Sequence, residues 1–364
     1  MSSKFTSELT EGMVTLTDTF STTGKLILQK NTVITKSIIN MLVNNDVIFV
    51  DVAEDDDAIS LSNTSENSIF NAEINLESIT NTPDYKMFKR RYEKQITNIS
   101  EHINDIVNRN APVDADVLLS CTTNILKSTQ SPLSIFTMLS TLKDYDDSTF
   151  NHSLNVSLIC NIFARWLGLS NSEIELLTLC GLLHDVGKLL IPNEIIKKPG
   201  KLTDQEFKII KSHTQKGYEL LKKRKADLHV QYAALMHHEK CDGSGYPLGM
   251  VDNQIDWVAQ IITIADIYEA MTSNRVYRGA LSPFSVINMF EEDGLRKYNP
   301  KFLLTFLEHV VNSYLNCKVK LSNGIEGDIV YINKVSLSKP LIKTNNEYID
   351  LSKKSDIKIL SILE

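Results

Sequence analysis

The chain has 364 residues, of which 42% are hydrophobic and 23% charged, and its formal net charge is −7. These values are ordinary for a globular protein of two or three domains with a sizeable core. The acidic balance argues against a broad basic surface for duplex nucleic acid. No run approaches the roughly 18 apolar residues of a membrane span. The N-terminus lacks the features of a signal peptide, and the five cysteines form no CxxC pair, so we expect a cytoplasmic protein with reduced thiols and no membrane association.

Residues 1–60 are predicted to form a small mixed α/β regulatory module. GKLILQKNTVI has strand character, TKSIINMLVNND has helical spacing, and VIFVDV has the pattern of a short buried strand. The following stretch, AEDDDAISLSNTSENS, is acidic and rich in serine and asparagine, which is typical of a loop or linker. Residues 61–130 are therefore predicted to hold an acidic linker and then a signalling helix.

Apolar residues recur at every third or fourth position in the segment 84–108. The stripe consists of Phe88, Tyr92, Ile96, Ile99, Ile103 and Ile106. Such a stripe is typical of an amphipathic helix packed on its own domain, and equally of a parallel helix that dimerises and relays a signal. The sequence leaves both interpretations open, and the second predicts a homodimer.

Residues 131–316 are predicted to be nearly all helical, because apolar residues are spaced by three and four throughout. In residues 317–364 the pattern changes to alternation, with Asn-Gly and Glu-Gly turns in CKVKLSNGIEGDIVYINK. We therefore expect a small β tail at the C-terminus.

Histidines and carboxylates are concentrated in the helical block. His184 and Asp185 follow the apolar run EIELLTLCGLL, and Asp266 lies within QIITIADIYEAM. A buried His–Asp pair is unfavourable unless each group is paired or binds a metal. His237 and His238 are adjacent, so on a helix they point in different directions and cannot share one packed face. Several helices are thus expected to place imidazoles and carboxylates around divalent transition metals. The candidate ligands are His152, His184, Asp185, His213, His237, His238 and Asp266.

These candidate ligands follow the order H…HD…H…HH…D, and HHEKCDGSGYP matches the pattern HHExxDGxGYP. LLHDVGK, KPGKLTDQEF and ADIYEAMTSNRVYR also occur in the corresponding order. The segment from about 135 to 315 therefore resembles the HD-GYP domain, a branch of the HD phosphohydrolase superfamily. The fold class expected is mainly α: a helical-bundle HD-GYP domain, a small mixed α/β N-terminal module and a small β C-terminal tail.

The resemblance implies a phosphodiesterase that opens cyclic di-GMP to linear pGpG, with GMP as a further product left open. It also implies two divalent transition-metal ions, with iron or manganese favoured, which make a water acidic enough to attack phosphorus near neutral pH. Asp185 would bridge the two ions. The ligands implied are His152, His184 and Asp266 for one ion and His213, His237 and His238 for the other. Some members bind a third metal through a Glu four residues before the first His, but this chain has Ser148 there.

Other residues are expected to contact the substrate. Lys188 lies one turn beyond the His–Asp pair and would stabilise the phosphate electrostatically, which makes it a catalytic candidate beside the bridging carboxylate. Arg275 and Arg278 follow Asp266 by 9 and 12 residues and would clamp the phosphates. Tyr246 would present its ring or hydroxyl to a guanine or a phosphate. The family also suggests that the GYP loop recruits diguanylate cyclases.

Three alternatives stay open at the level of sequence. The same site would suit another cyclic dinucleotide such as cyclic GMP-AMP, because no residue identifies the base. A catalytically silent receptor that signals through the helix at 84–108 is disfavoured, because every expected ligand of a dinuclear site is present. An oxygen-carrying di-iron protein would lack Lys188 and the GYP loop and is the weakest interpretation.

Overall fold

The computed structural model divides into two compact units, Met1–Asn75 and Leu76–Glu364, which are described separately below. No helix of the described residues is both long enough and apolar enough to cross a membrane. The described residues are 2–5, 9–16, 19–20, 26–44, 49–52, 82–127, 134–142, 149–198, 200–273, 280–354 and 356–363.

The first unit is small and mixed in its secondary structure. Strand β1 (Ser2–Phe5) pairs antiparallel with β4 (Phe49–Val52), and β2 (Thr19–Phe20) pairs antiparallel with β3 (Leu26–Leu28). The single helix described in this unit is α1 (Lys36–Asn44). Its side chains pack with those of the strands in a small core of Leu9, Leu28, Ile34, Leu42, Val50 and Val52.

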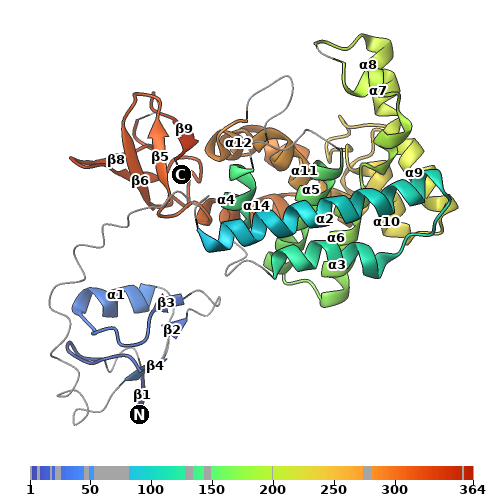
Figure 1. Ribbon diagram of the computed structural model, residues 1–364. Coiled ribbons are helices and arrows are strands. Elements are labelled where there is room, and N and C mark those ends of the chain that lie inside the picture. Colours follow the sequence, from blue (N-terminus) through green and yellow to red (C-terminus); the bar gives the residue numbers. More distant parts are fainter. Residues whose placement is uncertain are drawn as a thin grey trace. The chain divides into compact units, whose positions relative to one another are not determined.

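The second unit opens with the long helix α2 (Pro83–Asn108) and then α3 (Ala115–Leu126), which lie beside each other (Figure 1). Helix α2 starts where Thr82 accepts a hydrogen bond from the backbone N–H of Tyr85, and Pro83 occupies the first helical position. Its apolar stripe is buried against α3 and against helix α5 (Thr149–Trp166) of the same unit. The stripe therefore belongs to an amphipathic helix packed on its own domain, which removes the observation that predicted a homodimer.

The remaining elements form a helical bundle. Helix α5 is buried along most of its length and packs against α6 (Asn171–Leu183) and α11 (Trp257–Thr272). Helix α6 begins with a capping box, in which Ser170 and Glu173 satisfy each other's backbone N–H groups. Further helices are α4 (Ser134–Thr141), the 3-10 helix η4 (Val186–Leu190), α7 (Asn193–Ile196), α8 (Asp204–Lys211), α9 (His213–Lys223), α10 (Leu228–Met236), the 3-10 turn η5 (Asp252–Gln254), α12 (Pro283–Met289), the π-helix η6 (Phe290–Gly294), α13 (Leu295–Lys297) and α14 (Pro300–Asn312).

A five-stranded antiparallel sheet ends the chain, with strand order β8-β7-β6-β5-β9. Its apolar side chains belong to the same hydrophobic cluster as the helices. Glu291 of η6 fastens the loop that follows β6 by accepting hydrogen bonds from the backbone N–H groups of Leu337 (2.5 Å) and Ser338 (3.3 Å). The strands are β5 (Lys318–Leu321), β6 (Glu326–Tyr331), β7 (Leu341–Lys343), β8 (Tyr348–Asp350) and β9 (Ile359–Ile362). The prediction of a mainly α fold with a small β tail is confirmed.

Candidate metal centre

The structure brings together all seven side chains predicted from sequence to be metal ligands. His152 comes from the start of α5, Asp266 from the middle of α11, and His213 from the first position of α9. The other ligands lie where helices end. His184 and Asp185 follow α6, and His237 and His238 follow α10. Most of these side chains are almost fully buried, and His238 is partly exposed.

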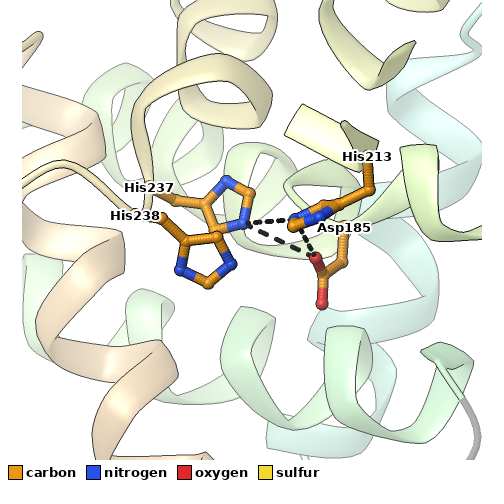
Figure 2. A group of neighbouring side chains, drawn as sticks. All are labelled: Asp185, His213, His237 and His238. Atoms are coloured by element: carbon orange, nitrogen blue, oxygen red, sulfur yellow. Dashed lines mark hydrogen bonds and ion pairs between the residues drawn. The ribbon is translucent and has the colours of Figure 1, made fainter. Parts of the chain in front are cut away.

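Asp185 lies at the centre of this cluster. Its Oδ1 is 3.3 Å from His213 Nε2 and 3.5 Å from His237 Nε2. Figure 2 draws both contacts as dashed lines. Its Oδ2 is 3.3 Å from His152 Nε2 and 3.5 Å from His184 Nε2. The possible ligand atoms accordingly form two groups that share Asp185, one with His152 and His184 and the other with His213, His237 and His238.

Asp266 lies next to the first of these groups. Its Oδ1 is 3.0 Å from His152 Nε2 and 4.0 Å from His184 Nε2, while its Oδ2 is 3.9 Å from His238 Nδ1. This matches the side of the site that the family resemblance assigns to Asp266. Two buried carboxylates surrounded by imidazoles provide the mixed oxygen and nitrogen ligands that transition metals accept.

Asp185 and His213 can meet only because helices η4 and α9 approach each other closely. A Cβ atom on Gly187 would lie 1.9 Å from the carbonyl oxygen of His213 and 2.6 Å from the backbone nitrogen of Gly217. Only glycine lets η4 lie so close to α9. The glycine of LLHDVGK thus places Asp185 within reach of His213.

Hydrogen bonds at Nδ1 indicate how the imidazoles are protonated. Nδ1 of His184 is 2.7 Å from the carbonyl of Gly181, and Nδ1 of His213 is 2.7 Å from that of Ile210. Nδ1 of His237 lies 3.0 Å from the Ala233 carbonyl. A carbonyl only accepts, so each Nδ1 carries the proton and each Nε2 keeps a lone pair directed toward Asp185.

These lone pairs have no favourable partner within the described part of the chain. Nε2 of His213 and Nε2 of His237 are only 3.3 Å apart, although neither can donate to the other. Nε2 of His152, Nε2 of His184 and Oδ1 of Asp185 are buried without a hydrogen-bond partner. Leaving such a group unsatisfied costs about 1–3 kcal/mol. Cations between the imidazoles and the carboxylate would satisfy all of these atoms, so the residues fit a metal centre.

The pKa shifts describe a cluster of unlike charges. Burial, together with the neighbouring His237, lowers the pKa of His184 to about 3. Burial would raise the pKa of Asp185, but Lys188, His184 and other neighbours hold that pKa well below its usual range. Burial would likewise lower the pKa of His152, yet Glu269 and the two aspartates raise it well above its usual value. Asp185 is therefore ionised and His184 neutral, which are the forms that bind metals.

The predicted substrate contacts are placed less completely. Lys188 Nζ forms a short ion pair with Asp185 Oδ2 and so lies directly at the metal centre. The ring of Tyr246 lies over His238, with the ring centroids 4.7 Å apart, and burial raises the pKa of its hydroxyl. Arg275 and Arg278 lie outside the described residues, as does Ser148.

The sequence analysis did not single out two carboxylates that contact the cluster or the adjoining GYP loop. Glu269 lies one turn beyond Asp266 on α11, and its Oε2 is 2.5 Å from His152 Nδ1. A second acid in the apolar run QIITIADIYEAM was the signal that could have revealed it. Glu239, the acid that follows the adjacent histidines, is buried and accepts hydrogen bonds from the backbone N–H groups of Leu248 (2.6 Å) and Met250 (3.0 Å). Glu239 thus holds the GYP loop against the end of α10.

Lys211 and Gly245 complete this loop's surroundings. Lys211 Nζ is 4.9 Å from the centroid of the Tyr246 ring and 4.6 Å from that of Phe207. A Cβ on Gly245 would lie 2.4 Å from the Cα of Glu239, so the loop can lie this close to Glu239 only with glycine there. The peptide bond between Tyr246 and Pro247 is cis.

Comparisons with known proteins agree with this geometry. The family model described as HD domain matches residues 135–302. A cyclic di-GMP phosphodiesterase of Pseudomonas aeruginosa is 35% identical over 204 residues, which are 56% of this chain and 49% of that protein. A 3'3'-cGAMP-specific phosphodiesterase of Vibrio cholerae is 41% identical over 146 residues, which are 40% of this chain and 34% of that one. The chain thus spans half or less of the length of these curated relatives.

A solved structure shows the same fold. An HDG"Y"P protein from Bdellovibrio bacteriovorus superposes with a TM-score of 0.51 at 16% sequence identity, covering 84% of this chain and 97% of that one. At this level of identity the likeness concerns the fold.

Proposed function

Because this chain belongs to the HD-GYP branch of the HD phosphohydrolases, we propose that it is a metal-dependent phosphodiesterase that hydrolyses cyclic di-GMP to pGpG, with GMP as a further product. The observation that carries the proposal is the position of Asp185, shared between two groups of imidazoles whose Nε2 atoms converge on it. The relatives named as cyclic di-GMP and 3'3'-cGAMP phosphodiesterases support the reaction class.

Two divalent transition metals would be held by these groups. His152, His184 and Asp266 would bind one, His213, His237 and His238 the other, and Asp185 both. Such a pair supplies Lewis acidity at the phosphoryl oxygens and lowers the pKa of water to near neutrality. We propose iron or manganese, following the family resemblance and the mixture of imidazole and carboxylate ligands.

The protein's own residues would orient the substrate. Lys188 keeps positive charge beside Asp185, where the charge of a phosphodiester has to be balanced. Tyr246 lies beside His238 at the edge of the site and would present its ring or hydroxyl to a guanine or a phosphate. Arg275 and Arg278 remain proposed phosphate contacts.

The cellular setting is part of the same proposal. All five cysteines are free thiols, which fits a reducing cytoplasm. The GYP loop is a proposed contact for diguanylate cyclases, in keeping with the exposed Leu248 beside it. A homodimer would need a surface other than the stripe of α2, since α3 and α5 cover that stripe.

Single-turnover hydrolysis tests the proposed function. Protein purified without oxygen would be mixed with cyclic di-GMP and, in parallel, with 3'3'-cGAMP, and its metal content measured on the same sample. We expect about two transition-metal ions per chain and cleavage to pGpG. Faster cleavage of 3'3'-cGAMP would replace the proposed substrate. Full metal occupancy and tight binding without cleavage of either compound would favour the receptor interpretation.

A further inference from the structure

A series of buried and partly buried hydrogen bonds leads from α2 to the candidate metal ligand His152. The hydroxyl of Tyr92 donates to Asn155 Oδ1 at 2.7 Å. Asn155 Nδ2 donates to Glu269 Oε1 at 2.9 Å, and Glu269 Oε2 accepts from His152 Nδ1 at 2.5 Å. Tyr92, Glu269 and His152 are all buried. We refer to Tyr92, Asn155 and Glu269 together as the Tyr92 network.

The chemistry of these groups fixes the direction of every bond. A carboxylate only accepts, so the amide nitrogen of Asn155 and the Nδ1–H of His152 must both donate to Glu269. The amide oxygen of Asn155 is then left to accept, and the Tyr92 hydroxyl donates to it. Nδ1 of His152 is thus committed to Glu269, which leaves Nε2 as the ring nitrogen available to a metal, and this atom is the one that faces Asp185 and Asp266.

Glu269 is well held in this position. Besides Asn155, the hydroxyl of Ser273 donates to Glu269 Oε1 at 2.8 Å. A carboxylate that accepts from the far nitrogen of a metal-binding histidine fixes the orientation of the ring and makes the imidazole a stronger ligand. The network therefore acts on the one metal ion that His152 would bind.

We propose that Tyr92, Asn155 and Glu269 are positioning residues for His152, and that α2 thereby sets the metal affinity of the group formed by His152, His184 and Asp185. This inference rests on the proposed function, because it takes that group as a metal site. Tyr92 is anchored in the core, where its ring centroid lies 5.9 Å from that of Phe88. A shift of α2 that separates the Tyr92 hydroxyl from Asn155 would leave Glu269 less firmly held. Such a shift would lower the affinity only for the ion that His152 binds.

The test measures the stepwise binding of Mn²⁺ to the metal-free full-length chain by calorimetry. In Glu269→Gln we expect the affinity for one of the two ions to fall by about 10- to 100-fold. In Tyr92→Phe, which removes only a hydroxyl, we expect that ion's affinity to fall by about two- to tenfold. The affinity for the other ion should be unchanged in both variants.

Tyr268→Phe is the matched control. Its hydroxyl is also buried and bonds to the Tyr314 hydroxyl at 2.8 Å, and Tyr268 lies on the same helix as Glu269 but outside the network. This variant should bind both ions as the wild type does. Thermal unfolding of the metal-free variants shows whether each one folds.

Each outcome separates this inference from the proposed function. If the wild type binds two ions and His152→Ala loses one, but Tyr92→Phe changes neither affinity, the positioning role is overturned and the proposed function stands. An equal loss of affinity for both ions, or the same loss in Tyr268→Phe, would show a general effect on stability. Either result would also overturn the positioning role. If the wild type takes up no Mn²⁺, the metal site itself fails, and the proposed function fails with it.

Discussion

His152 on one side of the metal centre and His213 and His237 on the other are oriented by different means. His213 and His237 hydrogen-bond through Nδ1 to backbone carbonyls three or four residues earlier, in the last turns of α8 and α10. A carbonyl in the last turn of a helix has a second lone pair and lies next to the residue that ends the helix, so a histidine there finds its acceptor locally. His152 lies near the start of α5, and its acceptor is Glu269, a side chain from a different helix.

This difference separates histidines that are oriented by their own chain segment, among them His184, from His152, whose orientation depends on tertiary packing. Wherever α8 and α10 form, His213 and His237 already have their proton on the right nitrogen. The orientation of His152 instead requires α5 and α11 to lie in register and, through the Tyr92 network, α2 as well. We therefore expect the orientation of His152 to be the part of the site that changes in tertiary packing affect most.

The largest effect should come from removing the group that both sides share. Asp185→Ala takes away the carboxylate between the two groups and leaves the imidazole lone pairs without their common partner. We expect the metal content to fall from about two ions to less than one and hydrolysis to become undetectable. Metal analysis and turnover of the same preparation measure this. Asp105→Ala, an exposed aspartate paired with Arg109, should behave as wild type. Retention of two ions in Asp185→Ala would contradict the central role of this residue.

His152→Ala and His237→Ala separate the two sides. Each variant should lose one of about two ions and keep the other, because each removes a ligand from one group only. Hydrolysis should fall by about 100-fold or more in both, since a single ion cannot stabilise both the attacking and the leaving oxygen. Stoichiometry by calorimetry provides the measurement. Simultaneous loss of both ions in either variant would mean that the two sides are not separable.

The variant Gly245→Ala tests whether metal binding by His213 and His237 also depends on the GYP loop. A Cβ there would collide with the backbone of Glu239, so the loop must move and Tyr246 must leave His238. We expect KM to rise and the free energy of unfolding to fall by about 1–3 kcal/mol, with both ions retained. Ser244→Ala, at an exposed position in the same loop, is the control. If Gly245→Ala also lost an ion, the backbone carbonyls that orient His213 and His237 would not be sufficient to keep that ion bound.

The smallest expected effect is the pH dependence of the metal-free protein. The pKa of His184 is about 3 in the folded chain, whereas an unfolded histidine titrates near about 6.5. Below about pH 6.5 the unfolded chain binds a proton at His184 that the folded chain does not, so the contribution of His184 to stability falls as the pH is lowered. His152, whose pKa is raised, contributes with the opposite sign. Between about pH 7.5 and 5.5 the contribution of His184 falls by about 1 kcal/mol. Urea unfolding with a chelator, compared with His184→Asn, isolates the contribution, which should vanish in the variant. An equal loss in the variant would assign the pH dependence to other groups.

The sequence predicted the parts of the site that depend on residue type and local position. The HD pair after an apolar helix and the adjacent histidines before the GYP loop were recognisable because each lies where a helix ends. Glu269 was missed because its role exists only when α5 and α11 are packed together. The stripe of α2 was ambiguous because the same spacing serves a dimer and a packed helix, and only the contact with α3 and α5 distinguishes them.

The C-terminal sheet has a consequence for where this protein can be cut. Val319, Ile329 and Ile342 are fully buried in the same cluster as side chains of the helices, and Glu291 reaches across to the loop after β6. A chain shortened before residue 317 would expose an apolar face and leave the Glu291 carboxylate without these donors. Although the sheet differs from the bundle in sequence pattern and secondary structure, it is not a detachable module. A minimal soluble fragment that carries the metal centre has to include it.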